Sequence, residues 1–283
     1  MDQMYMKEKP ILPLLLSMAL PMVISMFVNS LYNIIDSIFV AKISEDAMTA
    51  LSLVYPVQNF VNAVAIGFGI GLNAVISYYL GAGDKKAAGC AATQGLALTM
   101  LHAVILTIGS LLVIERFLRM FSSSETVIDL GVRYSRIIFL FTIAIMANLY
   151  FEKVFQAVGR MKVTMTGMMI GCIVNIILDP LLIFGIGPFP ALKVTGAAIA
   201  TIIAQMVVTL LFLFFASQDQ ILFHHIHLLQ APDSKKASEI FRLGLPSCLQ
   251  SLVFTGISMA IARLVAGYGD AAVAVQKVGA QIE

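Results

Sequence analysis

The sequence predicts an all-α, polytopic membrane protein. Of the 283 residues, 59% are hydrophobic and only 12% are charged, whereas a soluble domain carries roughly 25% charged residues. The mean hydropathy is +0.93, and a soluble globule could not bury so much apolar surface. Short polar segments separate long apolar runs. These observations exclude a soluble enzyme or binding module, and a net charge of +2 gives no indication of a nucleic-acid partner.

Seven apolar runs are long enough to cross a membrane. A bilayer core about 30 Å thick requires about 20 apolar residues in a helix. We expect spans at Ile11–Ala41, Met48–Leu80, Ala91–Ile114, Val132–Val158, Val163–Ile186, Leu192–Ala216 and Ile240–Ala266. Their similar lengths and short connections predict a compact helical bundle.

The seventh run is similar to the first. When the chain is shifted by 225 residues, Leu20-Pro21 falls on Leu245-Pro246, and Val40-Ala41 falls on Val265-Ala266. The longest polar linker of the chain precedes this match, and internal repeats are common in secondary transporters. We therefore expect a six-helix lobe followed by the first helix of a second repeat.

Three parts of the chain follow from this repeat. Residues 1–216 are expected to form the N-terminal six-helix lobe, and residues 217–238 a cytoplasmic interlobe linker. Residues 239–283 are then the start of a truncated C-terminal lobe. A cytoplasmic N-terminus is also expected, because that orientation places nine Lys and Arg residues in inner segments and five in outer loops, and cytoplasmic loops carry the excess.

A carboxylate in the first span marks a candidate functional face. An ionisable side chain within a span costs about 2.5–3.5 kcal/mol on insertion scales, which makes it a candidate for function. Asp36 shares one helix face with Asn29, Asn33, Met22 and Met26, because residues three, four and seven positions apart lie on the same side. We interpret the four other residues as the wall of a substrate cleft.

A second carboxylate, Asp179, lies in the fifth span with Asn175 four residues before it. Pro180 removes a backbone N–H and leaves an extra carbonyl acceptor nearby. Counted from the span ends, Asp36 and Asp179 both lie about 8–10 Å deep, and Thr201 of the sixth span lies at roughly 14 Å. These oxygens suit Na⁺ or a shared proton, and no other metal or cofactor is expected. The alternative is that each Asp is solvated at the interface or caps a helix.

Several segments resemble one known family. The matching stretches are Leu31–Asp36 (LYNIID), Asn175–Pro180 (NIILDP), Phe155–Lys162 (FQAVGRMK) and Gly196–Thr201 (GAAIAT). They are similar to the N-terminal lobe of multidrug and toxic compound extrusion (MATE) transporters, and the resemblance extends over essentially all of the chain.

The resemblance implies a twelve-helix antiporter with two six-helix lobes, which is not an enzyme. Such a protein exports organic cations in exchange for H⁺ or Na⁺ across a bacterial or archaeal plasma membrane. The family's cation site in this lobe maps onto Asp36, Asn175, Asp179 and Thr201. The expected partners are organic cations, membrane lipid and the C-terminal lobe that this chain lacks.

Two other functions stay open. A lipid-oligosaccharide flippase of the same superfamily would need a wide basic cleft, and Arg136 and Arg263 are few for that purpose. An intramembrane aspartyl protease would use Asp36, Asp179 or Asp270, and the last ends a GxGD sequence. That sequence lies at a helix end, which favours an ordinary loop.

Two further groups of residues are weaker candidates. Glu152 and Lys153, near the end of the fourth span, are expected to snorkel or to form a local ion pair, although they could line a cytoplasmic vestibule. His224, His225 and His227 lie in the linker without other ligands nearby, so a solvated strip is favoured over a metal site.

Overall fold

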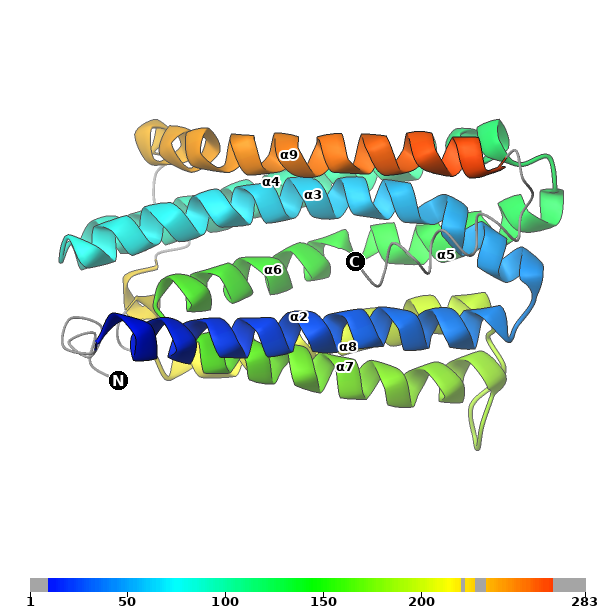
Figure 1. Cartoon of the computed structure of the whole chain (residues 1–283), viewed down its shortest axis with the longest axis horizontal. Helices are drawn as coiled ribbons and strands as arrows, with labels where there is room; N and C mark the ends of the chain where they lie inside the picture. Colours follow the sequence, from blue (N-terminus) through cyan, green and yellow to red (C-terminus); the bar gives the residue numbers. More distant parts are fainter. Residues whose placement is uncertain (1–9, 220–221, 227–232, 267–283) are drawn as a thin grey trace.

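The computed structural model describes residues 10–219, 222–226 and 233–266, and within these ranges the regular structure is entirely helical. The helices are α2 (Ile11–Ala41), α3 (Glu45–Gly81), α4 (Lys85–Phe121), α5 (Glu125–Leu140), α6 (Thr142–Ala157), α7 (Met161–Phe184), α8 (Val194–Ser217), the short 3₁₀ helix η1 (Phe223–His225) and α9 (Ser234–Ala266). They form an elongated bundle (Figure 1). Six are long and apolar enough to cross a membrane, or seven spans result if α5 and α6 count as one. The expected all-α membrane fold is confirmed.

Helix starts are set by capping side chains. Ser44, Asp84 and Ser124 each accept a hydrogen bond from the backbone N–H three residues later, as N-cap residues do. The helices that begin at the first two of these caps, α3 and α4, are 37 residues long each. The prediction for the third span, Ala91–Ile114, is therefore too short at both ends, and only residues 122–124 separate α4 from α5.

The predicted fourth span, Val132–Val158, is not one helix. Helices α5 and α6 meet at Phe141 and differ in direction by 51°. No Gly or Pro lies at this break, so the sequence carries no local signal for it. Both helices pack against α3, α4 and α8, and the bend lets the two halves of one span follow these neighbours.

Helices α2 and α9 are the segments that the 225-residue shift aligns. The shift places α2 on residues 236–266, and α9 spans Ser234–Ala266, so the two helices end at equivalent alanines. Pro21 and Pro246 lie inside them at equivalent positions. In Figure 1 both helices run in the same direction, with α3 between them.

Helix α9 packs closely along α3. Gly67 and Gly71 of α3 face Gly244 of α9, and an added Cβ on Gly244 would lie 2.6 Å from the carbonyl oxygen of Gly67. Small residues at such crossings let helix backbones approach each other in membranes. Beyond the glycines, the Asn59 amide donates a hydrogen bond to the Thr255 hydroxyl over 3.0 Å.

The start of the predicted linker is fixed to the lobe. The guanidinium group of Arg160 lies 2.7 Å from Asp219, whose side chain is completely buried. Asp219 also accepts the backbone N–H groups of Leu222 and Phe223. The ring of Phe223 packs on Phe151 and Phe155 of α6, so this part of the linker belongs to the packed bundle.

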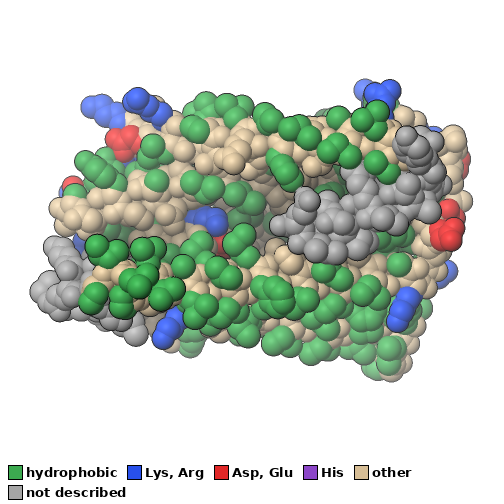
Figure 2. Space-filling view, viewed as in Figure 1, with side chains coloured by type: hydrophobic (Ala, Val, Ile, Leu, Met, Phe, Trp, Pro, Cys, Tyr) green, Lys and Arg blue, Asp and Glu red, His purple; other side chains and the backbone are tan. Residues whose placement is uncertain are grey.

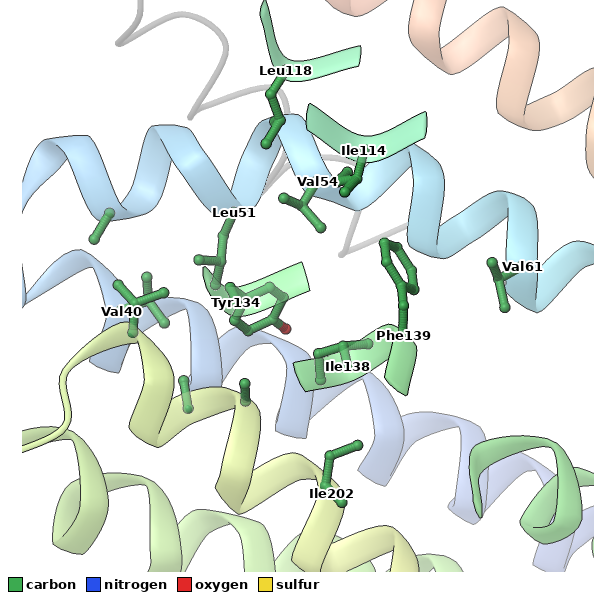
Figure 3. Close-up of a cluster of buried hydrophobic side chains, with 14 of the residues drawn as sticks. Val40, Leu51, Val54, Val61, Ile114, Leu118, Tyr134, Ile138, Phe139 and Ile202 are labelled. Carbon is green, nitrogen blue, oxygen red and sulfur yellow. The ribbon is translucent and has the colours of Figure 1, made fainter. Parts of the chain in front are cut away.

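The core contains a hydrophobic cluster next to a hollow in the bundle. Leu51, Val61, Tyr134, Ile138 and Phe139 belong to this cluster (Figure 3). Large hydrophobic side chains also cover much of the outer surface (Figure 2). Such a surface is compatible with lipid as the surrounding solvent.

The close α3–α9 contact predicts unequal effects of two Gly→Ala substitutions. Alanine is the better helix former by about 1 kcal/mol. At Gly71, however, the new Cβ would meet the backbone of Gly244 at 2.7 Å, and overpacking typically costs about 1–3 kcal/mol. We expect Gly71→Ala to lower the midpoint of thermal unfolding in detergent, measured with a thiol-reactive dye.

Gly256→Ala is the matched control, because an added Cβ at this α9 position meets no atom within 4 Å. It should leave the midpoint unchanged or raise it. Equal midpoints for the two variants would mean that the backbone contact does not limit packing at Gly71.

Candidate functional site

A cleft of about 380 Å³ opens between α2, α3, α5, α6 and α8. Its lining is mixed, with apolar side chains from the core cluster and polar ones from the surrounding helices. Amide and hydroxyl groups with a few convergent charged residues are typical of small-molecule sites. The polar lining residues are Asn29, Tyr32, Asn33, Asp36, Ser37, Tyr55, Gln58, Asn59, Asn62, Tyr134, Thr142, Thr201 and Gln205.

Two carboxyl groups meet at the wall of this cleft. Asp36 lines the cleft, while Asp179 lies behind it and is 0% exposed. The two side chains lie close enough to interact electrostatically, and neither carboxyl oxygen of Asp179 has a hydrogen-bond partner among the described residues. Adjacent carboxylates repel each other, so a proton or another cation bound between them would be stabilised.

Further oxygen atoms surround this carboxyl pair. Asn175, which is 1% exposed, donates through Nδ2 to the Thr201 hydroxyl over 3.5 Å. The phenol of Tyr32 lies beside the Thr201 hydroxyl. The amide oxygen of Asn175, Oδ1, is buried and accepts no hydrogen bond from the described residues. This surplus of oxygen acceptors fits Na⁺ or another hard cation.

The structure thus brings together all four residues predicted for cation coupling. Asp36 comes from α2, Asn175 and Asp179 from α7, and Thr201 from α8. Asn175 and Asp179 share a helix face because they lie four residues apart. Helix α2 packs mainly on α7, and this contact brings Asp36 to Asp179. The role of the four residues in coupling stays a prediction.

Two of the four residues predicted for a substrate wall line the cleft, and their role in substrate binding stays a prediction. Asn29 and Asn33 line the cleft, and Asn33 donates from Nδ2 to the Asn29 carbonyl oxygen over 2.8 Å. Met22 and Met26 do not line it, and they are 38% and 68% exposed. They lie on the same side of α2, but Met26 is ten residues before Asp36, which is about 15 Å along the helix. A shared helix face does not ensure that all its residues reach one cleft.

Sequence reasoning missed several polar groups opposite Asp36. The amide of Gln58 donates to the Tyr134 hydroxyl over 3.4 Å, and Asn62 and Tyr55 line the same cleft. Asn and Gln inside a predicted span are a usable signal, since polar groups in lipid need partners. No local pattern identifies Tyr134, because its position depends on the bend between α5 and α6.

The weaker candidates fall in three places. Glu152 and Lys153 form an ion pair on α6, with 2.9 Å between Lys153 Nζ and Glu152 Oε1. A local ion pair was one of the arrangements predicted for these two residues. His224 is exposed on η1. His227 and the GxGD sequence ending at Asp270 lie outside the described residues.

A comparison with protein families matches the MatE model to residues 21–181. The chain belongs to the MATE family of transporters. Among its relatives, the multidrug export protein MepA of Staphylococcus aureus (strain NCTC 8325 / PS 47) is 28% identical over 96% of this chain. A protein named FAD transporter, from Shewanella oneidensis, is 28% identical over 100% of it. The MATE chain spans only 60% and 62%, respectively, of the lengths of these relatives.

Solved MATE structures share the arrangement of helices. A transporter from Pyrococcus furiosus, reported with a binding pocket of reverse polarity, superposes with a TM-score of 0.85 and 30% identity, over 95% of this chain and 59% of its own. A multidrug resistance MATE transporter matches with a TM-score of 0.79 in both its inward-facing and its outward-facing conformation, at 29% identity. These matches cover 87% and 89% of this chain, and 56% and 54% of the neighbour. The fold of this MATE chain is therefore compatible with both conformations.

The position of Thr201 predicts a stability effect that depends on its hydroxyl group. Thr201→Val keeps the shape of the side chain but removes the hydroxyl group that accepts a hydrogen bond from the buried amide of Asn175. A buried polar group that loses its partner costs about 1–3 kcal/mol. We expect a lower midpoint of thermal unfolding for Thr201→Val in detergent. Thr201→Ser retains the hydroxyl and should stay closer to the parent, and the reverse order would contradict this network.

Proposed function

We propose that this chain supplies the N-terminal lobe of a multidrug efflux antiporter, which exports organic cations in exchange for H⁺ or Na⁺. The observation that carries the proposal is the close pair of carboxyl groups, Asp36 and Asp179, at the wall of the cleft. The family membership and the relationship to MepA support the same activity. The substrates, membrane lipid and a C-terminal lobe are the proposed partners.

The carboxyl pair explains how ion entry and drug release are linked. One proton, or one Na⁺ held by the carboxyl, amide and hydroxyl oxygens, neutralises the negative charge at Asp36. A cationic drug in the cleft is stabilised by that same charge. The two ligands therefore weaken each other's binding, and this reciprocal coupling lets the entry of one drive the release of the other. A gradient of the smaller ion then supplies the free energy for export.

The charge of the cleft supports cations over anions as substrates. Its described lining includes the carboxyl group of Asp36 and no Lys or Arg side chain. A flippase for anionic lipid-linked sugars, or a carrier of an anionic dinucleotide as the name of the Shewanella oneidensis relative suggests, would need positive charge there. The polar amides and phenols bind without strict shape demands, which suits a range of drugs.

We also propose a plasma membrane location with a cytoplasmic N-terminus. The segments assigned to the cytoplasmic side hold nine Lys and Arg residues, and the outer loops hold five. This excess supports the proposed orientation. In that orientation the carboxyl pair lies in the outer half of the membrane. Ion entry from outside then reaches Asp36 before Asp179, because only Asp36 faces the cleft.

Asp36→Asn and Asp179→Asn should each abolish ion-driven export. Amides keep the size of the side chain but hold neither an exchangeable proton nor a negative charge. The test uses proteoliposomes of the protein expressed from its complete gene, with ethidium efflux driven by an imposed pH or Na⁺ gradient. We expect at least a tenfold loss of rate, since such residues carry the coupling chemistry.

Asp129→Asn is the control, because Asp129 forms an exposed ion pair with Arg133 on α5, away from the cleft. It should retain the parent rate. Retained gradient-driven export in both the Asp36 and the Asp179 variant would show that the carboxyl pair does not couple transport.

A further inference from the structure

Three polar side chains of α6 form a second charged cluster within the bundle. The Lys153 ammonium donates to Glu152 Oε1 over 2.9 Å and to Gln156 Oε1 over 3.3 Å, and the Gln156 amide donates to Glu152 Oε1 over 2.8 Å. The charged side chains are only 14% and 13% exposed. A buried ion pair is costly within a span unless it serves a water-filled pathway.

This cluster lies beyond the end of the first cleft and is separate from it. Lys153 is eight residues past Ile145, the last α6 residue that lines the cleft, which is about 12 Å along the helix. On α3 it contacts Gly69, one turn past the cleft residue Ile66. Figure 2 shows Lys or Arg atoms beside Asp or Glu atoms in the hollow between α2 and α3.

Glu152 and Gln156 are four residues apart and face each other on the helix, whereas adjacent residues such as Glu152 and Lys153 do not. Lys153 reaches its partner only through its long side chain, which lies over Gly69, where a Cβ would come within 2.8 Å of Lys153 Cγ. The Asn73 amide donates a hydrogen bond to the Lys153 carbonyl oxygen over 3.1 Å, which holds this turn of α6 against α3. The Glu152–Gln156 pair therefore does not depend on Lys153 for its geometry.

A tethered ammonium group gives this carboxylate particular binding properties. When no ligand is present, the ion pair is neutral, which lowers the cost of burial. A ligand cation can replace the ammonium group on Glu152 and Gln156, and the lysine side chain can then extend into the hollow. Weakly binding cations do not displace the lysine, because it is present at a high effective concentration.

We propose that Glu152 and Gln156 form a second binding site for the cationic group of a substrate, and that the Lys153 ammonium occupies this site when no substrate is bound. The inference rests on the proposed export of organic cations. In the proposed orientation the site lies on the cytoplasmic side, where a drug enters before it reaches Asp36. Lys153 is then an internal competitor of the substrate.

Substitutions of Glu152 and of Lys153 should therefore change the affinity for a cationic ligand in opposite directions. Ethidium serves as a fluorescent monovalent cation, and its affinity is measured by anisotropy with the purified chain in nanodiscs. Glu152→Gln should weaken binding about tenfold, since loss of one partner of a buried charge pair has effects of this size or larger. Lys153→Gln should tighten binding several-fold, and Lys153→Arg, which keeps a competing cation, should bind like the parent.

A double-mutant cycle separates local competition from a general effect of charge. With local competition, the variant carrying both Glu152→Gln and Lys153→Gln binds as weakly as Glu152→Gln, because no carboxylate is left to compete for. If the charges act only through their long-range fields, the effects add and the double variant binds like the parent. That additive result, or weaker binding in both single variants, would overturn the inference.

Two controls keep this test independent of the proposed function. Asp129→Asn alters an exposed ion pair elsewhere on the lobe and should not change ethidium affinity. Asp36→Asn probes the first cleft. Suppose that Asp36→Asn weakens ethidium binding, while the Glu152 and Lys153 variants do not change ethidium affinity in opposite directions. Only the proposed second site is then wrong. If the opposite signs are found but Asp36→Asn has no effect in binding or export, the second site stands and the proposed coupling fails.

Discussion

The membrane interior offers no water to solvate charges, and this constraint acts on the charged groups that lie within the spans. A carboxyl group there must bind a proton, hold a cation or pair with a base. Asp36 and Asp179 lie close together where α2 packs on α7. Asp36 also faces the polar cleft, through which we propose that an ion enters. The hydroxyl of Thr201 and the amide of Asn175 complete that wall.

Helix α3 connects this polar wall to the rest of the bundle. One part of its surface lines the cleft with Gln58, Asn59 and Asn62. Its glycine positions, Gly67 and Gly71, allow α9 to lie close along it. Helix α3 therefore connects α9 to the helices that line the cleft. A movement of α9 relative to the lobe would be transmitted directly to the cleft, because both use the same rigid helix.

The two charged clusters have related but different designs. At Asp36 and Asp179, two like charges lie close together, and we propose that they bind a proton or Na⁺. At Glu152, a carboxylate is paired with the lysine on the next residue, and we propose that a cationic substrate group displaces that lysine. Figure 2 shows Lys or Arg atoms beside Asp or Glu atoms in the hollow between α2 and α3, and the same two helices line the cleft at Asp36. A substrate on the proposed path would meet the two clusters in sequence.

The sequence by itself predicted most of the membrane-crossing helices, the α2–α9 correspondence and the two carboxyl groups within the spans, because hydrophobicity and the cost of a charge in lipid depend mainly on each segment alone. It also indicated that Asn175 and Asp179 share a face, since helical spacing is local. Only the tertiary structure decided that Phe141 interrupts the fourth span, that Tyr134 lines the cleft and that Met22 and Met26 lie beyond it. These features depend on how helices distant in sequence pack against each other, and no local pattern of residues encodes that packing.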